Sequence, residues 1–128
     1  MSIEVNGITK VYGAQKALDN VTFSVGSKEI VGFLGPNGAG KSTMMKILTC
    51  YIPPTSGQAS VCGYDVSTQS IEVRRAIGYL PEHNPLYLDM YVKEFLEFAG
   101  GLHHIPNTRK RAQEMIELTG LGPEQKKK

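Results

Sequence analysis

The sequence is poor in cysteine and has no long apolar run. Two cysteines, Cys50 and Cys62, occur in 128 residues, and the first residues lack the pattern of a secretory signal peptide. In such a chain, isolated cysteines indicate free, buried thiols in a reducing compartment rather than a disulfide or a metal pair. No run of about 18 apolar residues occurs, so the sequence predicts no membrane-spanning helix.

A large excess of one charge is also absent. The formal net charge is +2, and the three lysines at 126–128 account for more than this excess. The sequence therefore predicts no basic face for nucleic acid, and we expect the lysine run to be a solvated tail. The apolar fraction of 41% is instead typical of one globular domain with a core.

What the sequence does contain is a glycine-rich segment at 35–43. It follows the phosphate-loop pattern, in which a glycine and four spacer residues precede Gly-Lys-Ser/Thr. An apolar run of strand length, 30–34, precedes the segment, and apolar residues at helical spacing follow it. Strand, glycine loop and helix form the context that the motif requires. The nine residues are Gly35, Pro36, Asn37, Gly38, Ala39, Gly40, Lys41, Ser42 and Thr43.

The residue types of this segment suit a triphosphate and Mg²⁺. Glycines let several backbone N–H groups point inward, and the start of the helix adds free N–H groups and a positive dipole end. Lys41 is expected to reach the β- and γ-phosphates as a mobile charge, and Ser42 to place its hydroxyl on Mg²⁺. Thr43 is expected to donate to the α-phosphate. A structural glycine turn would explain the glycines, but not a lysine and a serine at the helix start.

The remaining pattern predicts an α/β fold. Amphipathic strands followed by a wholly apolar one indicate an antiparallel β layer beside a buried, largely parallel sheet. We expect strands at 3–8, 21–25, 29–34, 58–62 and 77–80, a turn at 10–13, and helices at 41–51 and 71–76. Two further helices should begin at Asp89 and at Asn107 or Thr108, the second ending at Gly120.

In this order the residues resemble the ATP-binding subunits of ABC transporters. Tyr12 looks like the family's adenine-stacking aromatic, although a tyrosine before a glycine can simply be a packed turn. Segments 17–25, 54–63 and 77–82 resemble the family's second strand, the segment after the loop helix, and the glutamine loop. The resemblance spans essentially the whole chain. The run 79–87 looks especially like the gliding-motility-associated ABC subunit of Bacteroidetes and related ABC-2-type exporters.

The sequence departs from the family pattern at Glu82, where the family usually has glutamine. The resemblance implies that this side chain touches Mg²⁺ and helps to orient the attacking water. A carboxylate is a stronger oxygen ligand for Mg²⁺ than an amide, although its charge partly opposes the γ-phosphate. We therefore expect Glu82 to be a metal ligand and, with Lys41, a catalytic residue. The alternative is a surface glutamate after a strand-ending proline.

The resemblance also implies partners and a division of the chain. It implies ATP and Mg²⁺ as cofactors, and a second ATP-binding subunit and a membrane-spanning permease subunit as partners. The chain itself would lie on the cytoplasmic side of the inner membrane, attached through the membrane subunits. The fold implied is a truncated ABC-type P-loop NTPase core. Residues 1–86 would form the antiparallel β subdomain and the core, 87–120 the start of the helical subdomain, and 121–128 a tail.

Three features of the complete family do not occur between 101 and 128: the signature motif, the acidic strand and the switch histidine. The chain thus resembles the N-terminal part of an ATP-driven exporter subunit. We expect it to bind nucleotide weakly without turnover, and to self-associate because apolar strand edges would stay unpaired. Two other functions remain open, namely a non-transport ABC-type ATPase of DNA repair or translation, and another P-loop enzyme such as a kinase or GTPase.

Overall fold

The computed structural model describes residues 2–35, 40–81 and 86–128. These residues form two compact units, Met1–Leu80 and Pro81–Lys128. The predictions for Pro36 to Ala39 and for Glu82 concern residues outside the described ranges.

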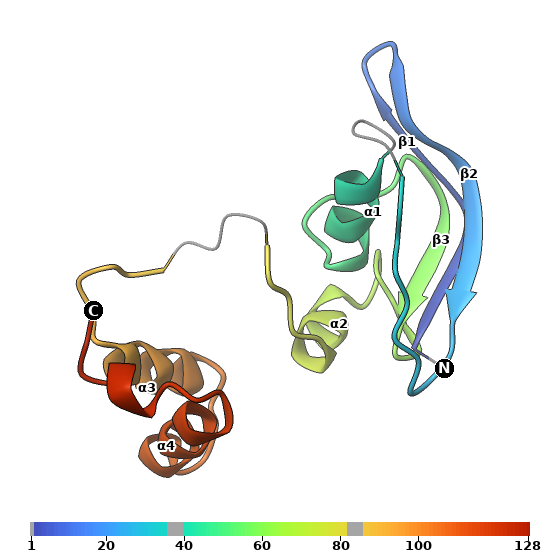
Figure 1. Ribbon diagram of the computed structural model, residues 1–128. Coiled ribbons are helices and arrows are strands. Elements are labelled where there is room, and N and C mark those ends of the chain that lie inside the picture. Colours follow the sequence, from blue (N-terminus) through green and yellow to red (C-terminus); the bar gives the residue numbers. More distant parts are fainter. Residues whose placement is uncertain (1, 36–39, 82–85) are drawn as a thin grey trace. The chain divides into compact units, whose positions relative to one another are not determined.

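The first unit is built on a four-stranded antiparallel sheet (Figure 1). Its strands lie in the order β2-β1-β3-β4. They are β1 (Ile3–Tyr12), β2 (Gln15–Val25), β3 (Ser56–Val61) and β4 (Tyr64–Asp65). In the register of the β1–β2 hairpin, Val5 pairs with Phe23 and Tyr12 pairs with Gln15. The sheet confirms the expected antiparallel β layer.

The first strand is longer than predicted. The expected turn at 10–13 is wrong for residues 10–12, because Lys10 pairs with Leu18 and Val11 with Lys16. These pairings satisfy the backbone groups of β1 up to Tyr12, so the chain reverses only after that residue. The longer strand places Tyr12 at the end of the hairpin.

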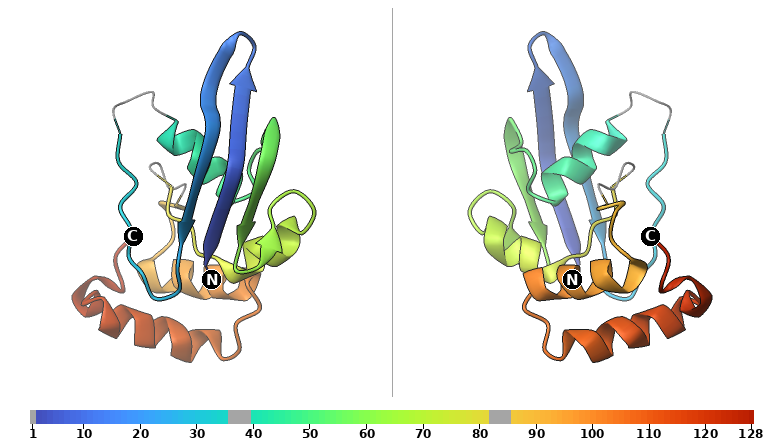
Figure 2. Two further views of the ribbon diagram at one scale, coloured as in Figure 1. Left: turned by 90° about the vertical axis from the view of Figure 1, so that its right-hand side faces the viewer. Right: turned by 90° about the vertical axis from the view of Figure 1, so that its left-hand side faces the viewer.

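Helix α1 (Lys41–Leu48) covers one face of this sheet, and α2 (Ser70–Ala76) follows β4. Figure 2 shows the layer of α1 against the sheet from both sides. The apolar stripe of α1, formed by Met44, Ile47 and Leu48, is buried. It packs in one core with side chains of the sheet and of the segments around α2. The other buried core residues are Val5, Ile8, Leu18, Ala59, Val61, Val66 and Val73.

The expected parallel strands at 29–34 and 77–80 do not form among the described residues. Ile30 and Leu34 are 105% and 92% exposed, whereas the ring of Phe33 lies 5.4 Å from that of Phe23. A strand needs neighbours that pair with its N–H and C=O groups. Neither segment has such a neighbour in the described part of the chain, so an apolar pattern alone does not produce a strand.

The second unit contains α3 (Val92–Leu102), α4 (Thr108–Leu118) and a 3-10 helix at Gly122–Glu124. The first helix begins later than predicted, because Tyr91 rather than Asp89 precedes its first turn. The carboxylate of Glu94 accepts a 3.0 Å hydrogen bond from the Tyr91 N–H, which stabilises this start. The second helix begins after Asn107 as predicted.

The last residues are not a free tail along their whole length. The N–H of Val92 donates to the Lys127 carbonyl at 2.9 Å, and the N–H of Lys93 donates to Gln125 at 3.3 Å. These carbonyls satisfy N–H groups that the first turn of α3 leaves without a helical acceptor. The side chains of the terminal lysines are exposed, as the sequence predicts.

Both cysteines are free thiols. Cys50 is half-buried, its thiol donates to the Val66 carbonyl at 3.5 Å, and burial raises its pKa. Cys62 is exposed at the β3–β4 turn, so the prediction of a buried thiol is wrong there. None of the described helices is long and apolar enough to cross a bilayer.

Candidate nucleotide-binding site

The start of α1 presents backbone N–H groups for which the described residues supply no acceptor. Gly40 precedes the helix with φ 91° and ψ 7°, and its carbonyl accepts the first helical hydrogen bond from Met44 at 2.9 Å. The N–H groups of the first turn, Lys41 to Thr43, have no acceptor within the helix. The first turn carries no acidic side chain. The described helix start therefore favours an anion.

Glycine is required at position 40 for two reasons. Its positive φ lies in the left-handed region, which a side chain disfavours. A Cβ there would also overlap the Ala17 carbonyl oxygen and lie 2.7 Å from Leu18 Cδ2. Glycine thus lets the start of α1 approach β2 closely, and this contact fixes the helix start beside the hairpin.

The hairpin and the helix start together line a pocket of about 360 Å³. Two short stretches that are distant in the sequence meet in it. Its lining residues are Tyr12, Gln15, Ala17, Gly40, Lys41, Ser42 and Thr43. An aromatic ring at one side and free N–H groups with a lysine at the other match the two ends of a nucleoside triphosphate. A volume of this size is within the range of small-molecule sites.

Tyr12 contributes a partly open ring to this pocket, with 47% of its surface exposed. Tyr12 pairs with Gln15 across the hairpin end, and Ala17 follows on β2. The sequence motifs did not assign Gln15 and Ala17 to the site. Their place in the sequence could have indicated this role. They follow Gly13, and a hairpin that turns there brings the next residues back beside Tyr12.

The lysine of the phosphate-loop motif lies beside the first glycine of the motif. The Lys41 ammonium donates a hydrogen bond to the Gly35 carbonyl. Ser42 is exposed at the helix start and Thr43 is half-buried. A serine hydroxyl is a hard oxygen donor of the kind that Mg²⁺ accepts beside phosphate and water, so Ser42 fits the expected metal.

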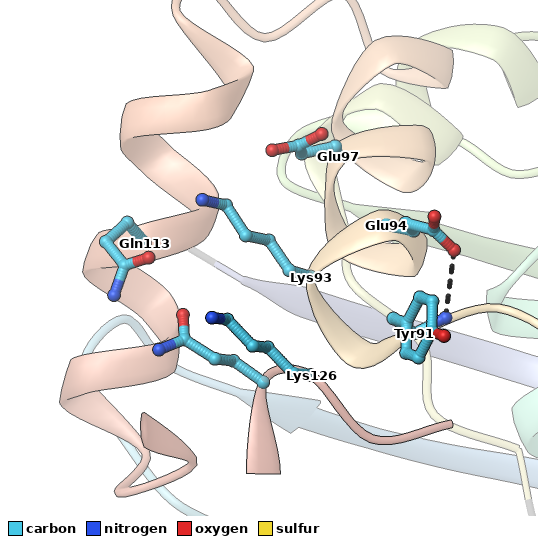
Figure 3. Close-up of a pocket in the computed structure, with 7 residues that line it drawn as sticks. Tyr91, Lys93, Glu94, Glu97, Gln113 and Lys126 are labelled. Carbon is cyan, nitrogen blue, oxygen red and sulfur yellow. Dashed lines mark hydrogen bonds between the residues drawn. The ribbon is translucent and has the colours of Figure 1, made fainter. Parts of the chain in front are cut away.

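A larger hollow of about 600 Å³ lies in the second unit (Figure 3). Lys93 from α3 and Gln113 from α4 extend into the same space, and Glu94 is held by its bond to Tyr91. Its lining residues are Tyr91, Lys93, Glu94, Glu97, Gln113, Gln125 and Lys126. Among the described residues, none that the phosphate-loop motif predicts lines the hollow, and its two carboxylates stand beside two lysines. Size therefore does not identify the nucleotide site here.

Comparison with known families removes one of the open classes. The model of the family described as ABC transporter matches residues 18–128. The chain belongs to the ABC transporter family. This membership does not fit the alternative of an unrelated P-loop kinase or GTPase.

Relatives and solved structures agree with this family. The chain is 38% identical to the daunorubicin resistance ATP-binding protein DrrA3 of Streptomyces coeruleorubidus, over 94% of this chain and 39% of that protein. It superimposes on the ATP-binding subunit of an ABC transporter with a TM-score of 0.84 at 30% identity, covering 98% of this chain and 53% of that chain. It also resembles the ATP-binding cassette MJ0796, solved as a dimer in a post-hydrolysis state with ADP and Pi. That TM-score is 0.80 at 25% identity, covering 97% of this chain and 60% of the other.

These likenesses confirm the ABC-type fold class. This chain spans about two fifths of the length of the Streptomyces protein, and between half and two thirds of the length of the two solved chains. The pocket between the β1–β2 hairpin and α1 lies within this shared fold.

Proposed function

We propose that this chain binds Mg-ATP as the nucleotide-binding part of an ABC exporter subunit. The pocket that joins Tyr12 to the start of α1 carries this proposal. The proposal assigns one half of the pocket to the phosphates and the other half to the base.

In the phosphate half, the N–H groups of the first turn of α1 would bind phosphate oxygens, and Lys41 would neutralise the β- and γ-phosphates. Ser42 would hold Mg²⁺, and Thr43 would donate to the α-phosphate. When bound, Mg²⁺ supplies charge neutralisation at the phosphate oxygens. Glu82 is proposed as a second metal-side residue on the resemblance alone. The loop residues 35–39 complete the proposed cradle.

In the base half, adenine would stack on the exposed face of Tyr12. Stacking buries apolar surface on both rings and is tolerant of the base, because every base has a π-face. Gln15 and Ala17 line the space beside the ring. We therefore propose a site that holds ATP and GTP with similar affinity.

We propose that hydrolysis belongs to the longer protein. Phosphoryl transfer depends mainly on positioning and charge stabilisation, for which Lys41 and Glu82 are the proposed catalytic residues of this chain. A dimer is supported by the cassette solved as a dimer after hydrolysis with ADP and Pi. Without the family's signature and water-activating residues, we expect the 128-residue chain to bind ATP without useful turnover.

We propose export as the process that this ATPase drives, together with a membrane-spanning permease partner. The chain would bind this partner at the cytoplasmic side of the inner membrane. The support is the similarity to a daunorubicin resistance ATP-binding protein. The link to gliding motility rests on the run 79–87, four residues of which lie outside the described ranges. It stays a prediction from resemblance. A non-transport role in DNA repair or translation has no supporting feature in the described residues.

The base half of the pocket is tested by Tyr12→Ala. We expect this change to weaken ATP binding about tenfold, because base stacking on an aromatic contributes about 1–3 kcal/mol. Binding of inorganic triphosphate should not change, and Tyr12→Phe should bind ATP like the wild type. Isothermal titration measures all of these affinities.

The matched control for this test is Tyr64→Ala, which removes an exposed tyrosine on β4, outside the pocket. It should leave ATP binding unchanged. An unchanged ATP affinity in Tyr12→Ala, or a strong preference of the wild type for GTP over ATP, would contradict stacking on Tyr12.

A further inference from the structure

The ring of Tyr12 has a cation beside it that the nucleotide pocket does not include. The Lys10 ammonium lies 5.5 Å from the centroid of the Tyr12 ring. Lys10 and Tyr12 are two residues apart on β1, so both side chains leave the same face of the strand. At this distance a cation is attracted by the negative π-face of the ring.

The Lys10 side chain is also held at a second point. Its ammonium donates a 2.8 Å hydrogen bond to the carbonyl of Pro53, in the connection between α1 and β3. A lysine ammonium whose one contact is an aromatic ring can readily leave that ring for solvent. A lysine that is bound to a backbone carbonyl at the same time has fewer rotamers available.

The connection that holds Lys10 is itself bound to β1 two residues after Pro53, at Thr55. The N–H of Thr55 donates to the Thr9 carbonyl at 2.8 Å, and the N–H of Val11 donates to the Thr55 hydroxyl at 2.9 Å. These two bonds flank Lys10 in the sequence. Three hydrogen bonds therefore join the connection at 53–55 to the end of β1, and one of them comes from the Lys10 ammonium. The same ammonium contacts the Tyr12 ring.

We infer that Lys10 is a positioning residue for the nucleotide base. Its ammonium, anchored on Pro53, engages one face of the Tyr12 ring and leaves the opposite face to the base. The ring is thereby ordered before the base arrives, and binding loses less side-chain entropy. This inference rests on the proposed stacking of the base on Tyr12.

The expected result is a selective loss in Lys10→Met, which keeps the aliphatic stem but removes the cation and the donor. ATP binding should weaken by about two- to fivefold, because a Tyr12 ring that is not held in the free protein has to be ordered when the base binds. Binding of inorganic triphosphate should stay at the wild-type value, which also reports that the variant is folded. Lys10→Arg, which keeps a cation and donors, should bind ATP like the wild type.

A double-mutant cycle separates positioning from general electrostatics. In a Tyr12→Ala background, Lys10→Met should cause no further loss of ATP affinity, because the ring that it positions is gone. The matched control is Lys16→Met, which removes the same charge from the hairpin at an exposed lysine that pairs with Asp19 at 3.6 Å. It should leave the affinities for both ligands unchanged.

A measurement without nucleotide tests the contact itself. In proton NMR, the ε-methylene of Lys10 should be shifted upfield by the ring current of Tyr12, and Tyr12→Leu should remove this shift. Four results would overturn the inference: no upfield shift, no effect of Lys10→Met, an equal loss for triphosphate, or a loss that persists without the ring. An unchanged ATP affinity in Tyr12→Ala would instead overturn base stacking, while the NMR shift still reports the contact of Lys10 with the ring.

Discussion

Replacing Lys41 by alanine should weaken the binding of Mg-ATP about a hundredfold. Lys41 is the charged side chain of the pocket, and it lies at the first turn of α1 beside the Gly35 carbonyl. A hydrogen bond to a charged group contributes about 1.5–3 kcal/mol, and the upper end applies where one ammonium contacts two phosphates. Isothermal titration with Mg-ATP measures the loss, and the same loss is expected for inorganic triphosphate.

The control for Lys41→Ala is Lys46→Ala on the same helix. Lys46 is exposed in the last turn of α1 and does not line the pocket. The two variants remove the same charge from one helix, and we expect Lys46→Ala to change ATP affinity by less than about twofold, as for a screened surface charge. Equal losses in both variants would mean that α1 attracts ATP only through its net charge.

Replacing Gly57 by alanine should lower the free energy of unfolding by about 3–5 kcal/mol, at the large end of single substitutions. Gly57 lies in β3 with φ +91°, and a Cβ there would overlap the Gly7 carbonyl and lie 2.8 Å from Ile8 Cα. The overlap is with backbone, so β1 and β3 would have to separate beside the buried Ile8. Urea unfolding followed by circular dichroism measures the loss.

Gly63→Ala is the matched control for this backbone contact. Gly63 also has a positive φ, +82°, but an added Cβ would meet open space. Its cost should be the conformational one alone, about 1–2 kcal/mol. Similar losses for Gly57→Ala and Gly63→Ala would show that the close approach of β3 to Gly7 has no separate energetic effect.

The phosphate-loop helix could be predicted from the sequence because its signals are local. The glycine at 40, the lysine and serine after it, and the helical spacing of Met44, Ile47 and Leu48 all lie within nine residues. The position of Tyr12 beside this helix could not be derived from spacing. It depends on the length of the β1–β2 hairpin, and the expectation came from the family resemblance.

The parallel strands were predicted from apolar runs, and this inference failed for a physical reason. An apolar run at 30–34 is compatible with a buried strand, but it does not say whether paired neighbours are present. The prediction for the start of α3 was wrong for a different reason. Asp89 was the predicted cap because of its residue type, but the helix begins after Tyr91, whose N–H donates to the carboxylate of Glu94.

The most direct measurement is an amide chemical-shift titration of the ¹⁵N-labelled protein with Mg-ATP. We expect the largest shifts at Gly40 to Thr43 and at residues 12–17, and in Lys41→Ala the same shifts should need about a hundredfold more Mg-ATP. Shifts confined to the hollow around Lys93 and Gln113 would contradict a nucleotide site between the hairpin and α1. So would the absence of any shift at millimolar Mg-ATP.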